Sequence, residues 1–175
     1  MKTSQLTSFF IKQILIKYGK NYKMLLVIAM DIYERIMEFR NKYKGGIAFR
    51  IKKHAKVVQN YLDSDEDVLY AFCGQKNDSV KEIVNTYAIV LTNKRIILGS
   101  KRVFWGSFFH TITPNMYNDM KVYKGLIWGK ITIDTVKEKV VLTNLPKNSL
   151  DEIETKISDF MRKAKLRYGM NNNRN

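Results

Sequence analysis

Apolar residues recur along the chain with two periods, and the change of period separates a helical part from a stranded part. Up to residue 62 the spacing is three or four, which is typical of one face of a helix. Asp31 and Glu34 have the spacing of a capping box, and Gly45-Gly46 interrupts the pattern. Residues 30–62 are therefore predicted to form two helices, whose apolar faces are Ile32, Ile36, Phe39 and Tyr43, and then Ile47, Ile51, Ala55, Val58 and Leu62.

From residue 68 the period falls to two, which is typical of strands. A final helix is then predicted from Leu150, Ile153, Ile157, Phe160 and Ala164, with a capping box formed by Ser149 and Glu152. The Asn-rich tail, residues 166–175, is expected to be disordered. The predicted strands are Val68–Gln75, Thr86–Thr92, Arg95–Ser100, Val103–Ile112, one around Met120–Tyr123, one in which Ile127, Gly129, Ile131 and Ile133 alternate with Trp128, Lys130, Thr132 and Asp134, and Val140–Leu145.

The stretch Thr86–Ser100 is the most informative of these segments. Two apolar runs rich in β-branched residues flank Asn93-Lys94. Asn tolerates the left-handed backbone of a tight turn, so the stretch is predicted to be a β-hairpin.

Three segments stand out. Ala88–Leu98 reads AIVLTNKRIIL, Leu62 precedes Glu66-Asp67-Val68-Leu69, and Gly125–Ile133 reads GLIWGKITI. In the same order, they resemble the core hairpin, the lead-in and the sixth strand of the YokE-like group of bacterial pleckstrin-homology (PH) domains. The resemblance covers about residues 62–162. It implies an α+β fold, in which a PH-like barrel of about seven antiparallel strands at residues 63–165 is capped by a C-terminal helix and preceded by N-terminal helices.

Residues 1–29 form a basic extension with five Lys and no acid. We consider three interpretations: a helix in a membrane interface, a helix packed on the main domain, and a segment upstream of a true start at Met30. The onset of regular patterning at Met30 favours the third.

Charge is distributed unevenly along the chain. The net charge is +15, with +10 in residues 1–60, +2 in residues 61–151 and +3 in residues 152–175. A basic surface of this kind attracts nucleic acid or anionic lipid, although it also serves simply as a solubilising surface.

The sequence offers little for catalysis or for metal binding. Asp63, Asp65 and Asp67 alternate as in an EF-hand loop, but the required Gly and Glu positions hold Val68 and Gly74. We therefore expect no metal, no cofactor and no enzyme activity, although a Cys73–His110 pair is possible in a barrel. The single cysteine allows no internal disulfide and favours a reducing cytoplasm.

Candidate binding residues lie at the two ends of the third predicted strand. They are Lys94, Arg95, Lys101 and Arg102, which suit an anion or the protection of a sheet edge. Trp105 joins them because consecutive aromatics such as Phe104-Trp105 cannot both face a core, so one of each pair points outward. Apart from the outward member of each consecutive pair, the aromatics of this region are expected to fill the core; the set is Phe104, Trp105, Phe108, Phe109, Tyr117, Tyr123 and Trp128.

The sequence thus favours a non-catalytic PH-like module that contacts a protein, or another copy of itself, through outward aromatics or a sheet edge. The alternative is peripheral attachment to an anionic membrane, at the inner face, through residues 1–60 and the Arg162–Arg167 cluster. Nonspecific nucleic-acid binding is a third hypothesis, without a recognised reading element. No small-molecule substrate is evident.

Overall fold

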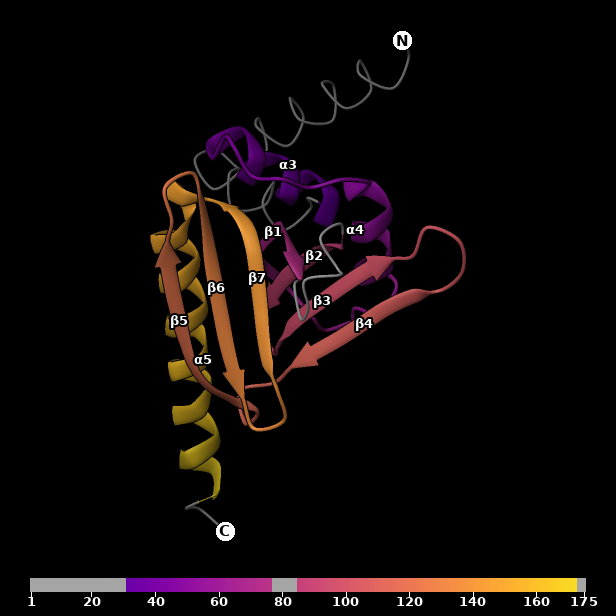
Figure 1. The fold of residues 1–175 in the computed structure, drawn as a ribbon. Helices are drawn as coiled ribbons and strands as arrows, with labels where there is room; N and C mark the ends of the chain where they lie inside the picture. Colours follow the sequence, from indigo (N-terminus) through magenta and orange to yellow (C-terminus); the bar gives the residue numbers. More distant parts are fainter. Residues whose placement is uncertain (1–30, 77–84, 173–175) are drawn as a thin grey trace, which may run out of the picture. The chain divides into compact units, whose positions relative to one another are not determined.

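The computed structural model describes residues 31–76 and 85–172, with side chains up to Arg167. The predictions for residues 1–29 therefore lie outside the described residues. One antiparallel sheet of seven strands curls into a half-barrel, with the strand order β4-β3-β2-β1-β7-β6-β5 (Figure 1). The strands are β1 Val68–Lys76, β2 Thr86–Thr92, β3 Ile96–Lys101, β4 Ser107–Ile112, β5 Tyr117–Lys124, β6 Trp128–Thr135 and β7 Lys139–Pro146.

The strand connections gather at opposite ends of the strands. The β2–β3, β4–β5 and β6–β7 connections lie together at one end, which we call the second rim, because Ile96 pairs with both Leu91 and Ile112 and Val136 N donates to Met116 O. The β3–β4 and β5–β6 connections lie at the other ends of their strands, which we call the first rim. Among the described residues, β1 and β7 share two pairs, Gln75↔Thr143 and Lys76↔Leu142, which connect the two halves of the curled sheet.

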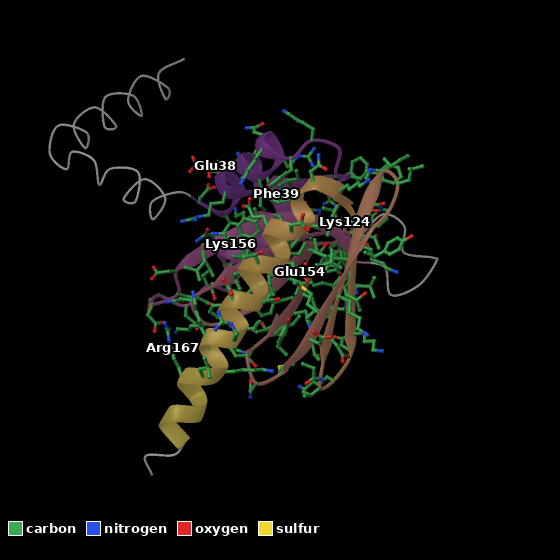
Figure 2. The ribbon with its side chains drawn as sticks, turned by 90° about the vertical axis from the view of Figure 1, so that its left-hand side faces the viewer. Glu38, Phe39, Lys124, Glu154, Lys156 and Arg167 are labelled. Carbon is green, nitrogen blue, oxygen red and sulfur yellow. The ribbon has the colours of Figure 1, made fainter. Side chains whose placement is uncertain are left out.

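The C-terminal helix α5 (Leu150–Asn172), preceded by the short 3-10 helix η2 (Lys147–Ser149), lies along the half-barrel (Figure 2). Leu150, Ile153 and Ile157 are fully buried as predicted, and Met161 continues the same face. Together with residues such as Phe72 from the strands they form the inner core. The predicted capping helix and the PH-like fold are confirmed.

Two further helices, α3 (Ile32–Lys42) and α4 (Ile51–Gln59), cover the opposite face of strands β1 to β3. Their buried residues pack against small and branched side chains of the sheet and form an outer core, of which the members are Ile32, Ile36, Ala55, Val58, Ala71, Cys73, Ala88, Val90 and Ile97. Both faces of β2 are thus buried, which explains why the predicted hairpin is apolar at consecutive positions rather than at alternate ones.

α4 lies very close to β3 because β3 carries Gly99. A Cβ atom at that position would come within 2.4 Å of Val58 Cγ2. The absence of a side chain on Gly99 therefore allows the short distance between α4 and β3.

Three boundaries differ from the prediction. α4 begins at Ile51, and residues 44–49 are not helical. The prediction began too early because the spacing between Ile47 and Ile51 fits a helix by coincidence. β4 begins at Ser107, so Val103–Gly106 belong to a loop. α5 extends to Asn172, through residues predicted to be a disordered tail.

The two predicted capping boxes have different outcomes. Asp31 and Glu34 bond each other's backbone as expected at the start of α3. Ser149 instead donates to the carbonyl of Pro146, and the carboxylate of Glu152 accepts from Lys42 and Tyr43. The side chain of Glu152 thus ties α5 to the end of α3.

Candidate functional site

The β3–β4 loop, residues 102–106, presents an apolar tip to solvent. It is closed by a hydrogen bond from Arg102 N to Gly106 O, with Gly106 at φ 79°, a backbone region that favours glycine. Phe104 is 88% exposed and Trp105 is 86% exposed, and Val103 is exposed beside them. The expectation that one residue of the Phe104-Trp105 pair faces the core is wrong, because both belong to this loop.

The other aromatics expected in the core are divided between core and surface. Tyr117 is buried in the inner core, and Phe109 is partly buried with its ring stacked on Tyr61, 4.2 Å between centroids. Phe108, Tyr123 and Trp128 are exposed. The large side chains that fill the inner core are instead Phe39, Phe72 and Tyr87.

A groove of about 690 Å³ lies between α4 and the β3–β4 loop, and we call it the basic groove. Among the described residues, no carboxylate lines it. Its charged residues are Arg50, Lys53, Lys56, Lys101 and Arg102, and Val57, Asn60, Tyr61, Val103, Phe104 and Ser107 complete the lining. The apolar tip and the cations thus form one continuous surface.

Arg50 attaches the loop to α4. Its guanidinium donates to the carbonyls of Lys101 (3.3 Å) and Arg102 (3.2 Å). Its backbone lies in the left-handed region at φ 52°, a conformation that is costly for a residue other than glycine. The side-chain contacts of Arg50 help to offset this cost.

His54 of α4 binds the end of β3 through its ring. Its Nδ1 accepts from Lys101 N at 2.8 Å and lies 3.3 Å from Ser100 Oγ. Burial, together with the nearby Arg50, lowers the pKa of His54 to about 4. The ring is therefore neutral near pH 7, which is the form that this acceptor role requires.

The other two predicted cations lie at the opposite end of β3, so the structure separates the four into two pairs. Lys94 Nζ lies 2.6 Å from Asp65 Oδ1 and 3.7 Å from Asp63 Oδ2. Arg95 forms ion pairs with Asp63 and Glu66. Both cations are engaged by the acidic turn, residues 63–67, and their role in anion or partner binding stays a prediction.

Glu66 is the centre of this second cluster. It accepts from Arg95 Nε and Nη2, both at 2.9 Å, and from Thr92 Oγ1 at 2.6 Å. Burial alone would raise the pKa of Glu66, but the hydrogen bonds from Arg95 and Thr92 outweigh it and hold the pKa below its usual range. The cluster locks the lead-in turn onto the β2–β3 hairpin.

The comparisons with known proteins now agree with this fold. The model of a family described as "Bacterial PH domain" matches residues 62–159. The chain belongs to the bacterial PH domain family. Assignment to the YokE-like group stays a prediction. The segments that carried the resemblance, the lead-in and the hairpin, are the two parts that Glu66 joins.

Two solved structures are among those to which the chain is similar. One is a DUF1696 family protein with a pleckstrin-homology domain from Shewanella loihica PV-4, at 16% identity and a TM-score of 0.41, covering 69% of this chain and 95% of that chain. Another is a pleckstrin homology domain from Shewanella amazonensis SB2B, at 15% identity and a TM-score of 0.39, covering 73% of this chain and 97% of that chain. No curated protein matches the chain.

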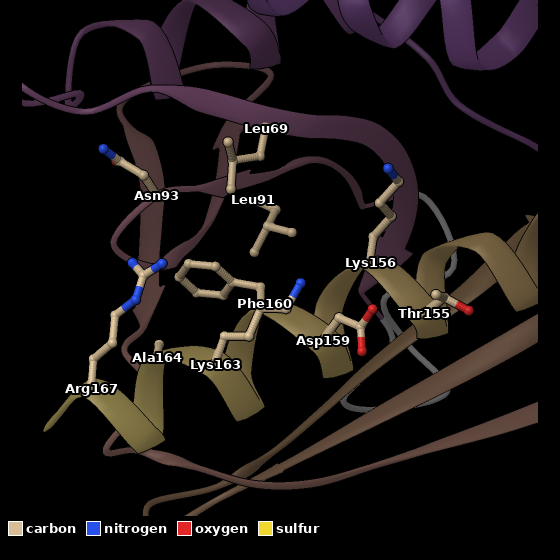
Figure 3. A pocket seen from close by; sticks show the side chains of 10 residues that line it. All are labelled: Leu69, Leu91, Asn93, Thr155, Lys156, Asp159, Phe160, Lys163, Ala164 and Arg167. Carbon is tan, nitrogen blue, oxygen red and sulfur yellow. The ribbon is translucent and has the colours of Figure 1, made fainter. Parts of the chain in front are cut away.

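A second groove of this PH domain, about 550 Å³, lies between α5 and strands β1 and β2 (Figure 3). Leu69, Leu91 and Phe160 give it an apolar floor. Lys156, Lys163 and Arg167 line it together with Asp159. Unlike the described lining of the basic groove, it carries a carboxylate, Asp159.

The residues considered for catalysis do not meet in this PH domain. Cys73 of β1 belongs to the outer core, whereas His110 lies on β4, where it pairs with Leu98 of β3, and strands β2 and β3 separate it from β1. Burial raises the pKa of the Cys73 thiol to about 12. Within the described residues, no group of three or more His, Cys, Asp or Glu is placed to hold a metal ion, and no helix is long and apolar enough to cross a membrane.

Sequence reasoning missed part of the basic groove. The sequence placed Arg50, Lys53 and Lys56 only within the broad basic region of residues 1–60, and not beside Lys101 and Arg102. A signal for them existed, since residues 39–62 contain seven Lys or Arg and no acid. The position of the β3–β4 loop beside that helix has no comparable signal in the sequence.

Proposed function

We propose that this PH domain is a peripheral membrane-binding module that docks on anionic lipid through the β3–β4 loop and the basic groove. One observation carries the proposal: an exposed tip of Val103, Phe104 and Trp105 adjoins a groove whose described lining has five cations and no carboxylate. PH domains are common binding modules and are generally non-catalytic, which fits such a role.

The apolar tip supplies the first contribution to docking. Burying apolar surface is worth about 25 cal/mol per Å², and Phe104 and Trp105 leave nearly all of their side chains in water. Trp is also enriched at the boundary between lipid headgroups and acyl chains. Insertion of the tip into the apolar layer of a bilayer therefore lowers the free energy of the bound protein relative to the protein in water.

The cations supply the second contribution. Lys or Arg near an anionic bilayer contributes about 1 kcal/mol each. No ion pair of the described residues includes Lys53, Lys56 or Lys101, so these amines are available for lipid phosphates. Arg102 stacks over the ring of Phe108, 3.9 Å from its centroid, and so stands between the apolar and the charged parts.

The leading hypothesis from the sequence, contact with a protein or with a second copy, uses the same surface. Self-association through it is opposed by charge, because a two-fold contact brings the same cations of both copies together. Protein contact and nucleic-acid binding therefore become alternative outcomes of one test.

Co-sedimentation with vesicles at about 150 mM salt measures the proposed binding. We expect the protein to pellet with vesicles that contain phosphatidylglycerol and not with phosphatidylcholine alone. The double variant Phe104→Ser/Trp105→Ser should bind at least about tenfold more weakly, since it loses most of the apolar tip. The control is Val136→Ser/Leu166→Ser, which removes two exposed apolar side chains away from the loop.

Two results contradict the proposal: equal binding to both kinds of vesicle, and wild-type binding by the loop variant. Light scattering of the same samples detects the first alternative, a dimer that dissociates when the loop is changed. Retention on a single-stranded oligonucleotide that depends on Trp105, without vesicle binding, assigns the loop to nucleic acid instead.

A further inference from the structure

The β5–β6 connection presents a second apolar tip. Gly125 N donates to Trp128 O, which places Leu126 and Ile127 at the centre of a tight hairpin turn. Leu126 is 91% exposed and Ile127 is 65% exposed, and Tyr123 is exposed beside them. Such positions ordinarily hold Gly, Asn or Asp, so the exposed apolar pair has no local structural reason.

Both apolar tips lie on the first rim of the sheet. The segment between α3 and α4, residues 43–50, joins them, and we call it the strap. At one end Trp128 Nε1 donates to Gly45 O at 2.8 Å, and at the other Arg50 donates to Lys101 O.

The hydrogen bonds of the strap follow the strand order of the sheet. Gly45 O accepts from Trp128 of β6, and two residues later Ile47 N donates to Asn144 O of β7 at 3.0 Å. Phe49 N then donates to Thr86 Oγ1 at the start of β2, at 3.1 Å. The strap therefore crosses the rim from β6 to β3 and fixes the two tips along one edge of the domain.

The surface between the tips is apolar and cationic. Phe49 of the strap is 55% exposed. The strap and α4 carry Lys44, Arg50, Lys52, Lys53 and Lys56 and contain no acid. A bilayer surface of anionic lipid matches both properties at once, since the tips enter the apolar layer while the cations stay among the headgroups.

We infer that the β5–β6 tip is a second insertion point, so that the domain rests on the membrane along its first rim, with Leu126 and Ile127 at one end and Phe104 and Trp105 at the other. This inference rests on the proposed function. It adds an orientation and a second contact that the β3–β4 loop alone does not require.

An environment-sensitive dye attached to an introduced cysteine tests this orientation. Cys73 is fully buried and its raised pKa leaves the thiol protonated, so native protein is labelled only at the new site. The labelled variants are Leu126→Cys, Trp105→Cys and, as the control in the β6–β7 turn of the second rim, Val136→Cys. On phosphatidylglycerol vesicles we expect a blue shift with the dye at positions 105 and 126 and none at position 136.

The binding of Leu126→Ser/Ile127→Ser provides a second readout, with an expected loss of about tenfold. Combined with Phe104→Ser/Trp105→Ser, the fold-losses should multiply, since the tips are separate. A shift at position 105 without one at position 126 overturns the inference and leaves the proposed function intact. Absence of binding to any vesicle overturns both.

Discussion

His54 connects α4 to the end of β3 through one ring nitrogen. Because Nδ1 accepts from Lys101 N, protonation of the ring would place a proton against that donor. The groups that face it are the Arg50 guanidinium, the backbone of Phe49 and the Ser100 hydroxyl, which itself donates to Thr86 O at 2.8 Å. His54 therefore supports the β3–β4 loop only while it is neutral.

This protonation makes the stability of the domain dependent on pH. Between pH 6.5 and about 4 the unfolded chain protonates His54 whereas the folded chain does not, so the free energy of unfolding falls as the pH is lowered through this window and then levels off. Allowing for solvent screening, the loss is on the order of 2 kcal/mol. Urea unfolding of the wild type at pH 7 and pH 4.5 measures it.

The matched variant is His54→Asn, whose amide oxygen takes the place of Nδ1 and does not titrate. We expect it to be less stable than the wild type at pH 7 and to lose less stability on acidification. Carboxylates of lowered pKa, such as Asp65, Glu66 and Glu152, destabilise both proteins equally in acid. Parallel pH profiles for the two proteins would show that His54 does not titrate in this range.

At the scale of elements, the lead-in turn and the β2–β3 hairpin behave as one unit. Asn93 strengthens the lock around Glu66, since its side chain accepts from Asp67 N and donates to Asp65 O. The residues by which the chain resembles PH domains are thus engaged in structure. This is why they identify the fold without identifying a ligand.

Neutralising the buried carboxylate should break this unit. Glu66→Gln leaves Arg95 without its two-pronged partner, and removal of one member of a buried ion pair costs about 3 kcal/mol. Denaturant unfolding gives the change in free energy. The control is Asp65→Asn in the same turn, because Asp65 is an exposed partner of Lys94 and should leave the unfolding midpoint nearly unchanged. Equal effects of the two variants would show that the turn is held only by surface charge.

Much of the fold could be predicted from apolar periodicity because each strand and helix buries one continuous set of positions. The prediction that the fourth strand begins at Val103 was wrong, because β-branched and aromatic residues favour strands whether or not they are buried. The prediction that α4 includes Ile47 was wrong. Ile47 has the spacing of a helical residue, but its amide donates to the carbonyl of Asn144 instead of to a helix carbonyl. Local patterns do not contain the contact partners that decide such cases.

The candidate site could be predicted only in part. Lys101, Arg102 and Trp105 are local neighbours, and the structure keeps them together in the β3–β4 loop. Lys53 and Lys56 join them only because Gly99 lets α4 lie close to β3, which is a long-range contact. The strap that links the two apolar tips likewise depends on hydrogen bonds between segments far apart in sequence.

At the scale of the whole domain, the basic residues lie at two separate ends. The strap lies at the first rim, and Lys53 and Lys56 of α4 line the basic groove with the β3–β4 loop there. The end of α5 lies at the second rim, since Lys165 stacks over Tyr117 at the start of β5, and Lys163 and Arg167 line a groove with Asn93 of the β2–β3 turn. The two ends are separated by the length of the sheet (Figure 1), and β6 alone has eight residues, or about 26 Å.

This separation predicts that only one end contributes to membrane binding. Lys53→Gln/Lys56→Gln removes two cations of the basic groove, at about 1 kcal/mol each, so we expect binding to phosphatidylglycerol vesicles to weaken about thirtyfold. Lys163→Gln/Lys165→Gln removes the same charge from the far end and should change binding less than about twofold. At about 150 mM salt the Debye length is about 8 Å, so cations one sheet length from the bilayer are screened. Equal losses from the two variants would mean that net charge, rather than the first rim, draws the domain to the membrane, and a loss confined to the second variant would mean that it docks by α5.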